Sequence, residues 1–156
     1  MQMRMMRNME LQKNKVLLGL SGGVDSATAA LLLKEKGFNV TGFYFDVKGQ
    51  TEQGRAEAEA VAKQLDIPLI YEDVSSDSRG IVIENFITEY LHGRTPNPCV
   101  LCNPNIKFQR LIHHADEIGA YYIATGHYCR ILHDETNHAY YIRRAVNDKK
   151  DQSYML

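Results

Sequence analysis

Hydrophobic residues along the chain follow two alternating patterns: short apolar runs, and stretches in which apolar residues recur every three or four positions. The runs predict four strands, at residues 16–20, 38–45, 68–74 and 121–125. The helical spacing predicts helices at residues 27–36, 58–65, 83–90 and 108–115. We expect the leucines at 31–33 and the last strand to be buried. Strands that alternate with helices form βαβ units, so the pattern predicts an α/β fold with a parallel sheet.

Three parts of the chain stand outside this pattern. Residues 92–104 contain three prolines within nine positions, which predicts a shaped loop rather than a helix or a central strand. Residues 128–132 and 139–144 predict a β-hairpin around a polar turn. Residues 1–14 lack the continuous apolar core of a secretory signal, so we interpret them as a flexible lead-in.

Composition and charge limit the classes of function. The chain has 156 residues, enough for one globular domain, and a net charge of −1, which disfavours nucleic-acid binding by the whole surface but allows a local basic patch. Candidate phosphate contacts are Arg94, Lys107, Arg110, Arg130, Arg143, Arg144, Lys149 and Lys150. No apolar run reaches the length of a membrane span, so we expect a cytoplasmic protein without membrane attachment. Three cysteines in such a chain favour free thiols or a metal site over a disulfide scaffold.

A serine- and glycine-rich turn, Ser21-Gly22-Gly23-Val24-Asp25-Ser26, joins the first strand to the first helix. Free backbone N–H groups at a helix N-terminus attract anions, and the glycines let the backbone approach a phosphate. No Gly-Lys-Ser/Thr follows, which excludes the Walker pattern. The turn resembles the pyrophosphate loop of the N-type ATP pyrophosphatases, which implies cleavage of ATP to AMP and pyrophosphate. The alternative is a turn without a ligand.

In a parallel sheet, ligands lie beyond the C-terminal ends of the strands. This rule brings together the turn at 21–26, the end of the second strand and residues 125–127. We expect Phe45 to lie against the adenine, Gly126 to admit the nucleotide closely, and Asp25 to bind Mg²⁺ in part. His127 is either a phosphate contact or a hydrogen-bonded structural histidine.

The proline-rich segment carries Cys99-x-x-Cys102. Two cysteines at this spacing could belong to a zinc site, a redox pair or an iron–sulfur cluster, whereas Cys129 reads as a structural thiol. As a sulfur nucleophile, Cys102 would need a lowered pKa. We expect Lys107 and a helix N-terminus near residue 105 to supply the positive potential.

Taken together, the motifs are similar to those of one family, the bacterial tRNA-specific 2-thiouridylases of the MnmA/TrmU type. The matching motifs are the turn at 21–26, residues 94–98 with the two cysteines and Ile106-Lys107-Phe108, Ala124 to Tyr128, and Lys150 to Tyr154. The resemblance implies a Rossmann-like fold of the adenine nucleotide alpha hydrolase-like (HUP) class, a parallel sheet sandwiched by helices with a C-terminal β-hairpin.

The resemblance also assigns roles. It implies ATP binding by Gly19, Leu20, Ser21, Gly22, Gly23, Val24, Asp25, Ser26, Phe45 and Gly126. It places the target uridine against Asn97, Pro98 and Cys99, and tRNA against Lys150, Asp151 and Gln152. The catalytic candidates are Cys102, Asp25 and Cys99. Cys99 stands where the family usually has an aspartate, which puts the proton-transfer role of that position in doubt.

The activity implied is ATP-dependent 2-thiolation of the tRNA wobble uridine, through an adenylated base and a cysteine persulfide. The resemblance implies ATP and Mg²⁺ as cofactors and a disulfide bond in the members of the family. It implies two partners, tRNA and a cysteine desulfurase or sulfur-relay protein that donates the sulfur. Residues 15–145 would form the ATP pyrophosphatase domain and residues 146–156 would begin a linker. The family's second cysteine and its tRNA-gripping domains lie beyond Leu156, so we expect a fragment that is inactive alone.

Two other functions remain open. One is an ATP pyrophosphatase that adenylates a different substrate, for example in amide or lysidine formation. The other is a non-catalytic module that binds a nucleotide or a metal.

Overall fold

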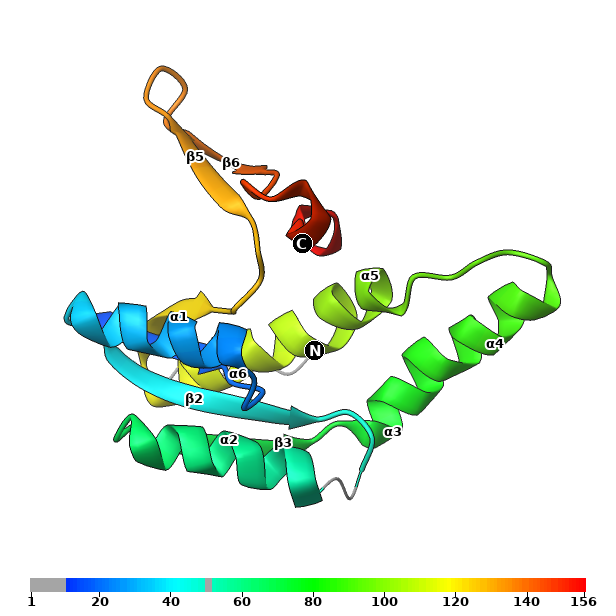
Figure 1. Ribbon diagram of the computed structural model, residues 1–156, viewed down its shortest axis with the longest axis horizontal. Helices are drawn as coiled ribbons and strands as arrows, with labels where there is room; N and C mark the ends of the chain where they lie inside the picture. Colours follow the sequence, from blue (N-terminus) through cyan, green and yellow to red (C-terminus); the bar gives the residue numbers. More distant parts are fainter. Residues whose placement is uncertain (1–10, 50–51) are drawn as a thin grey trace, which may run out of the picture.

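The computed structural model describes residues 11–49 and 52–156, so most of the expected lead-in, 1–14, lies outside the described residues. Its centre is a parallel sheet, of which β2 and β3 are labelled in Figure 1, and the strand order is β3-β2-β1-β4. The strands are β1 (Gln12–Gly19), β2 (Asn39–Asp46), β3 (Leu69–Asp73) and β4 (Ala120–Ala124). The predicted α/β class is confirmed. The chain leaves β1 for β2 on one side and returns to β4 on the other, which puts the change in strand order beside β1.

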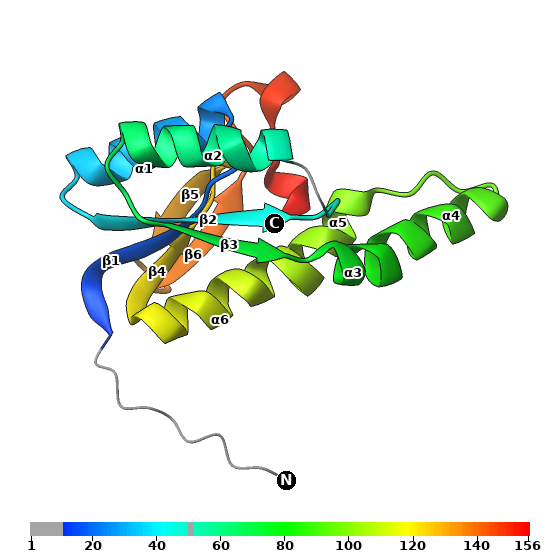
Figure 2. The ribbon, with the colours of Figure 1, turned by 90° about the horizontal axis from the view of Figure 1, so that it is seen from below.

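Helices cover both faces of the sheet (Figure 2). Helices α1 (Val24–Glu35) and α2 (Glu52–Gln64) lie on one face, and α6 (Phe108–Ile118) lies on the other. The alternation of β1 explains this, because Val16 and Leu18 pack with α1 and α2, whereas Leu17 packs with α6. All three side chains are at most 1% exposed.

Two burial predictions were wrong. Leu31 and Leu32 are 46% and 51% exposed, and only Leu33 packs against the core. A single helix face meets the sheet, so three consecutive residues cannot all point inward. Strand β4 lies at the sheet edge, and Tyr121 and Tyr122 are 49% and 45% exposed.

The third predicted helix, at residues 83–90, forms part of a long arm that extends away from the sheet (Figure 1). The arm consists of α3 (Ser75–Asp77), the π-helix η1 (Ser78–Ile83) and α4 (Glu84–Leu91). The expected apolar face is present but exposed: Ile83, Phe86, Ile87 and Tyr90 are between 38% and 55% exposed. The periodicity therefore predicted the helix correctly, while its apolar face lacks a covering element among the described residues.

The prediction of a loop through residue 104 was wrong. Helix α5 (Pro98–Cys102) and the π-helix η2 (Asn103–Lys107) run directly into α6. Pro98 occupies the first helical turn, where its missing N–H costs nothing, and the Asn97 side chain accepts a hydrogen bond from the Cys99 N–H at 3.2 Å. Pro104 lies in the wider π turn, which relieves the clash of its ring with the preceding turn.

The C-terminal part confirms the predicted hairpin. Strands β5 (Arg130–Asp134) and β6 (Ala139–Arg143) pair antiparallel and project away from the main sheet (Figure 1). Two short 3₁₀ turns follow, η3 (Asp148–Lys150) and η4 (Ser153–Met155), and bring the chain back beside α5, where Asn103 Nδ2 donates to the Met155 carbonyl at 3.0 Å. No helix among the described residues is both long and apolar enough to cross a membrane.

Candidate active site

The turn after β1 is closed by its two serines. Ser26 Oγ donates to the Gly23 carbonyl at 3.0 Å and accepts from the Ser21 N–H at 3.2 Å, while the two hydroxyls lie 3.1 Å apart. Gly23 is the N-cap of α1 and provides no side-chain cap. The first N–H groups of an α-helix have no partner within the helix, so here they remain available to an anion. This is the arrangement that the sequence predicted for a phosphate loop.

Two glycines let neighbouring elements approach this turn. Gly22 has φ +82°, and a Cβ there would lie 2.8 Å from backbone atoms of Glu57 and Ala58 in α2. At Gly126, a Cβ would lie 2.9 Å from the Ser26 nitrogen. Gly126 was expected to admit the nucleotide, but the group it directly admits is the backbone at the start of α1.

We expect Gly126→Ala to destabilise the fold and to weaken nucleotide binding, because the new methyl group meets rigid backbone. Overpacking of this kind costs about 1–3 kcal/mol. Gly80→Ala is the matched control, since its Cβ would meet nothing within 4 Å and its φ is not positive. Urea unfolding and ATP titration of both variants check the prediction, and an equal effect of the two substitutions would contradict it.

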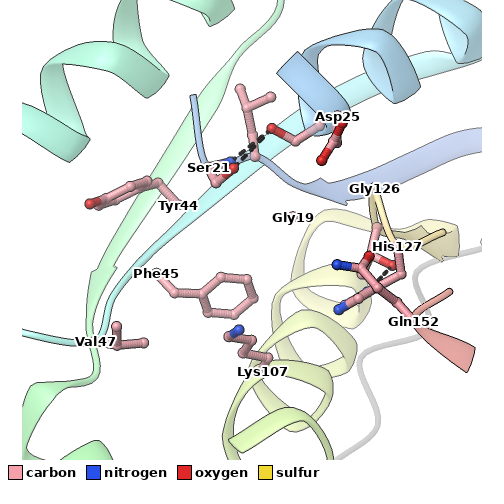
Figure 3. Close-up of a pocket in the computed structure, with 13 residues that line it drawn as sticks. Gly19, Ser21, Asp25, Tyr44, Phe45, Val47, Lys107, Gly126, His127 and Gln152 are labelled. Atoms are coloured by element: carbon pink, nitrogen blue, oxygen red, sulfur yellow. Dashed lines mark hydrogen bonds between the residues drawn. The ribbon is translucent and has the colours of Figure 1, made fainter. Parts of the chain in front are cut away.

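A cavity of about 400 Å³ opens in front of the turn, at the C-terminal ends of β1, β2 and β4 (Figure 3). Seven of the ten predicted ATP-binding residues line it: Gly19, Leu20, Ser21, Asp25, Ser26, Phe45 and Gly126. Gly22, Gly23 and Val24 lie outside its lining, and Val24 is 78% exposed. The size and the polar turn at one end suit a nucleotide, with Phe45 as an apolar wall.

Lys107, His127 and Gln152 also line the cavity, from elements far apart in the chain (Figure 3). The His127 ring bonds Thr125 Oγ1 at 2.8 Å, and burial together with the Lys107 charge lowers its pKa. Both effects favour the neutral imidazole. Sequence reasoning had left His127 open, and the structure gives it both a structural hydrogen bond and a place at the cavity.

Cys102 belongs to a buried cluster that packs against two residues of the cavity wall, and it does not itself line the cavity. It is 9% exposed and packs with Val74, Val82 and Ile106, against Phe45 and Val47 of the wall. Burial raises its pKa, Cys99 raises it further, and Lys107 lowers it. The expected net lowering was wrong for this arrangement, although Lys107 acts in the expected direction. The helix N-terminus also lies at Pro98 rather than near residue 105.

The described residues supply few metal ligands near the two cysteines. Cys99, Cys102 and Cys129 are all free thiols. Within residues 11–49 and 52–156, no group of three histidine, cysteine or carboxylate side chains is arranged to hold a metal ion. An iron–sulfur cluster or a zinc ion needs at least three such ligands, so this donor set fits neither.

The Lys150–Gln152 segment folds back toward the site. Asp151 accepts hydrogen bonds from the Ala145 and Ser153 N–H groups and from the Ser153 hydroxyl, at 2.8, 3.3 and 2.8 Å. These bonds hold the pKa of Asp151 below its usual value. Gln152 pairs with the backbone of Tyr128, and the Tyr128 hydroxyl donates to Asp25 Oδ1 at 2.8 Å, which raises the Tyr128 pKa. Sequence reasoning missed the roles of Tyr128 and Gln152 at the cavity, although both lie in the motifs of the resemblance.

Some of the candidate phosphate contacts already have protein partners. Arg94 pairs with Glu89 through two hydrogen bonds of 2.5 and 2.7 Å, and Arg110 pairs with Asp77 at 2.5 Å. The Arg130 guanidinium donates to the Arg144 carbonyl at 2.8 Å. Lys107 is the candidate that lines the cavity.

Comparison with known proteins decides the family. A family model described as the tRNA methyl transferase HUP domain matches residues 14–156. The chain belongs to this family. The HUP domain found here is 47% identical over 152 residues to a tRNA-specific 2-thiouridylase of Clostridium botulinum (strain Hall), covering 94% of this chain and 42% of that protein. It is 44% identical over 156 residues to a tRNA-specific 2-thiouridylase of Thermoanaerobacter sp. (strain X514), covering 92% and 43%. The resemblance to the 2-thiouridylases is confirmed, and the chain spans less than half the length of these relatives.

Solved structures confirm the HUP fold. The U34-tRNA thiolase NcsA of Methanococcus maripaludis, solved with its [4Fe-4S] cluster, matches with a TM-score of 0.53 and 25% identity, covering 76% of this chain and 39% of that one. A predicted tRNA methyltransferase subunit of Methanocaldococcus jannaschii matches with a TM-score of 0.52 and 23% identity, covering 73% and 53%. The second likeness concerns the fold alone.

Proposed function

We propose that this chain is the ATP-binding domain of an enzyme that replaces the C2 oxygen of the tRNA wobble uridine with sulfur. One observation carries the proposal: the cavity beside the phosphate-type turn shares its wall residues Phe45 and Val47 with the packing around Cys102. A nucleotide in the cavity and the cysteine-bearing helix α5 would therefore lie next to each other at one end of the sheet. The names of the curated relatives support the same reaction.

The cavity side would bind and orient ATP. The N–H groups at the start of α1 and the hydroxyl of Ser21 would hold the phosphates, and Phe45 would contact the adenine. Asp25 is exposed at the cavity mouth and would be one ligand of Mg²⁺, which fits because oxygen ligands suit that ion. When bound, Mg²⁺ neutralises phosphate charge. The residues Gly19, Leu20, Gly22, Gly23, Val24, Ser26 and Gly126 would shape this site.

The α5 side would receive the base. The uridine O2 attacks the α-phosphorus, pyrophosphate leaves, and the base then carries AMP as a good leaving group. The outer sulfur of a persulfide, loaded by the sulfur donor on a cysteine outside this chain, attacks C2 and displaces AMP together with the oxygen. The Cys102 thiol then attacks the inner sulfur, which breaks the S–S bond, releases the 2-thiouridine and leaves a disulfide between the two cysteines. The proton of the thiol returns to N3 of the base, which lost one on adenylation. Asn97, Pro98 and Cys99 would contact the flipped uridine, and Cys102 would act as the catalytic thiol. No step is assigned to an iron–sulfur cluster.

The remaining parts follow from the same proposal. Residues 15–145 would form the pyrophosphatase domain, 1–14 a lead-in, and 146–156 the start of a connection to tRNA-binding domains. Lys150 is exposed and would contact tRNA, while Asp151 and Gln152 would hold its backbone in place. The partners would be tRNA and a cysteine desulfurase or relay protein, in the cytoplasm.

Formation of AMP tests the proposal. We expect this chain to bind ATP with Mg²⁺, and we expect a fusion of this chain with the remaining part of the Clostridium botulinum relative to release AMP and pyrophosphate faster when unmodified tRNA and a sulfur donor are added. Radiolabelled ATP and thin-layer separation measure both products. Pyrophosphate release stimulated by a small carboxylic acid instead of tRNA would favour another adenylating enzyme, and ATP binding without any AMP would favour a non-catalytic module.

A further inference from the structure

We propose that Tyr128 is a positioning residue for the Asp25 carboxylate, a role that rests on the proposed binding of ATP with Mg²⁺. The Tyr128 hydroxyl donates to Asp25 Oδ1 at 2.8 Å, across a sequence separation of 103 residues. Asp25 lies in the first turn of α1 and lines the cavity. Tyr128 follows β4, so the bond joins the two elements on either side of the change in strand order.

Tyr128 is itself anchored through its backbone. The Gln152 N–H donates to the Tyr128 carbonyl at 2.9 Å, and the Tyr128 N–H donates to Gln152 Oε1 at 3.0 Å. One residue therefore satisfies both backbone groups of Tyr128. Gln152 is held in turn because its neighbour Asp151 binds Ala145 and Ser153. Tyr128 is 42% exposed, yet these bonds fix the backbone from which its side chain extends.

Gly126, two residues before Tyr128, lies against the backbone of Asp25. A Cβ at Gly126 would lie 3.0 Å from the Asp25 carbonyl carbon and 2.9 Å from the Ser26 nitrogen. The segment 126–128 thus contacts the backbone of Asp25 through Gly126 and its side chain through Tyr128. An exposed aspartate at a helix start would otherwise sample several rotamers, and this contact selects one of them.

The chemistry of the phenol suits a cation ligand. A neutral O–H donor occupies one carboxylate oxygen and leaves the full negative charge on the group. Among the described residues, Asp25 Oδ2 receives no hydrogen bond, so this second oxygen keeps its lone pairs available, and Asp25 lines the cavity. A lysine or arginine in the same place would neutralise the charge that Mg²⁺ needs. Fixing the carboxylate before the ion arrives lowers the entropic cost of binding.

Tyr128→Phe removes only the hydroxyl and tests the role. Since the carboxylate loses the hydrogen bond that fixes its orientation, we expect the Kd of ATP at saturating Mg²⁺ to rise about fivefold. Without Mg²⁺, the Kd should change less than about twofold. Tyr140→Phe is the matched control, because Tyr140 is 71% exposed on β6 and contacts only the His133 ring in the described hairpin. Isothermal titration calorimetry of the unsubstituted chain and both variants, with and without Mg²⁺, gives the six constants.

A double-mutant cycle separates positioning from a general structural effect. In an Asp25→Asn background, Tyr128→Phe should have no further effect on Mg²⁺-dependent binding, because its target is gone. Equal losses with and without Mg²⁺, additive losses in the cycle, or no loss at all would overturn the role of Tyr128. These outcomes leave tRNA-stimulated AMP formation by the unsubstituted fusion intact, whereas failure of this chain to bind ATP overturns the proposed function as well.

Discussion

Replacing Cys102 by serine is expected to lower tRNA thiolation by at least about 10³-fold, because a hydroxyl is a far poorer nucleophile than a thiolate and loss of a nucleophile has effects of this size or more. ATP affinity should stay within about twofold of the unsubstituted protein, since Cys102 does not itself line the cavity. A suitable protein is a fusion in which this chain replaces the N-terminal 42% of the Clostridium botulinum relative. Mass spectrometry of the nucleosides from digested tRNA measures 2-thiouridine.

Cys129→Ser is the matched control, because Cys129 is also a free thiol, although only partly buried, and does not line the cavity. Full thiolation by the Cys102→Ser fusion would remove Cys102 from the reaction. The raised pKa of Cys102 adds a pH dependence. Because the neutral thiol is favoured, alkylation of Cys102 by iodoacetamide should be slow at pH 7 and should accelerate only above the ordinary pKa of a thiol.

Gly22→Ala is expected to have the largest effect on stability. An alanine at φ +82° is strained, and its Cβ would also lie 2.8 Å from backbone atoms of α2. Backbone strain of about 1–3 kcal/mol and overpacking of about 1–3 kcal/mol act together here. The α1 start would have to move away from α2, so ATP binding should fall as well. Urea unfolding and calorimetric titration of ATP measure the two effects.

Gly37→Ala isolates the contribution of the backbone angle. Gly37 has the same φ, +82°, but a Cβ there would meet nothing within 4 Å. We expect this variant to lose only the strain contribution, about 1–3 kcal/mol, and to keep its ATP affinity. Equal destabilisation by the two alanines would show that the contact between the turn and α2 is unimportant.

The sequence was most informative where local rules suffice. Alternation and helical spacing predicted the strands and helices, and the turn at 21–26 predicted the end of the sheet at which the cavity opens. The proline-rich segment misled because prolines exclude a helix only in its regular interior, whereas Pro98 starts α5 and Pro104 lies in a π turn. The pKa of Cys102 depends on Val74 and Val82, whose approach no local pattern reveals.

The chain turns back toward the site at Asp151, and this determines where the protein can be divided into fragments. A cut at residue 145, where the sequence alone suggests a boundary, would remove the acceptor for the Ala145 N–H and both partners of the Tyr128 backbone. It would also remove the Met155 carbonyl, which accepts a hydrogen bond from the side chain of Asn103, the residue directly after the cysteine-bearing helix α5. The last six residues therefore connect the two sides of the site, because they contact Tyr128 on one side and Asn103 on the other. We expect a piece that ends at residue 145 to lose its structure first at these two contacts.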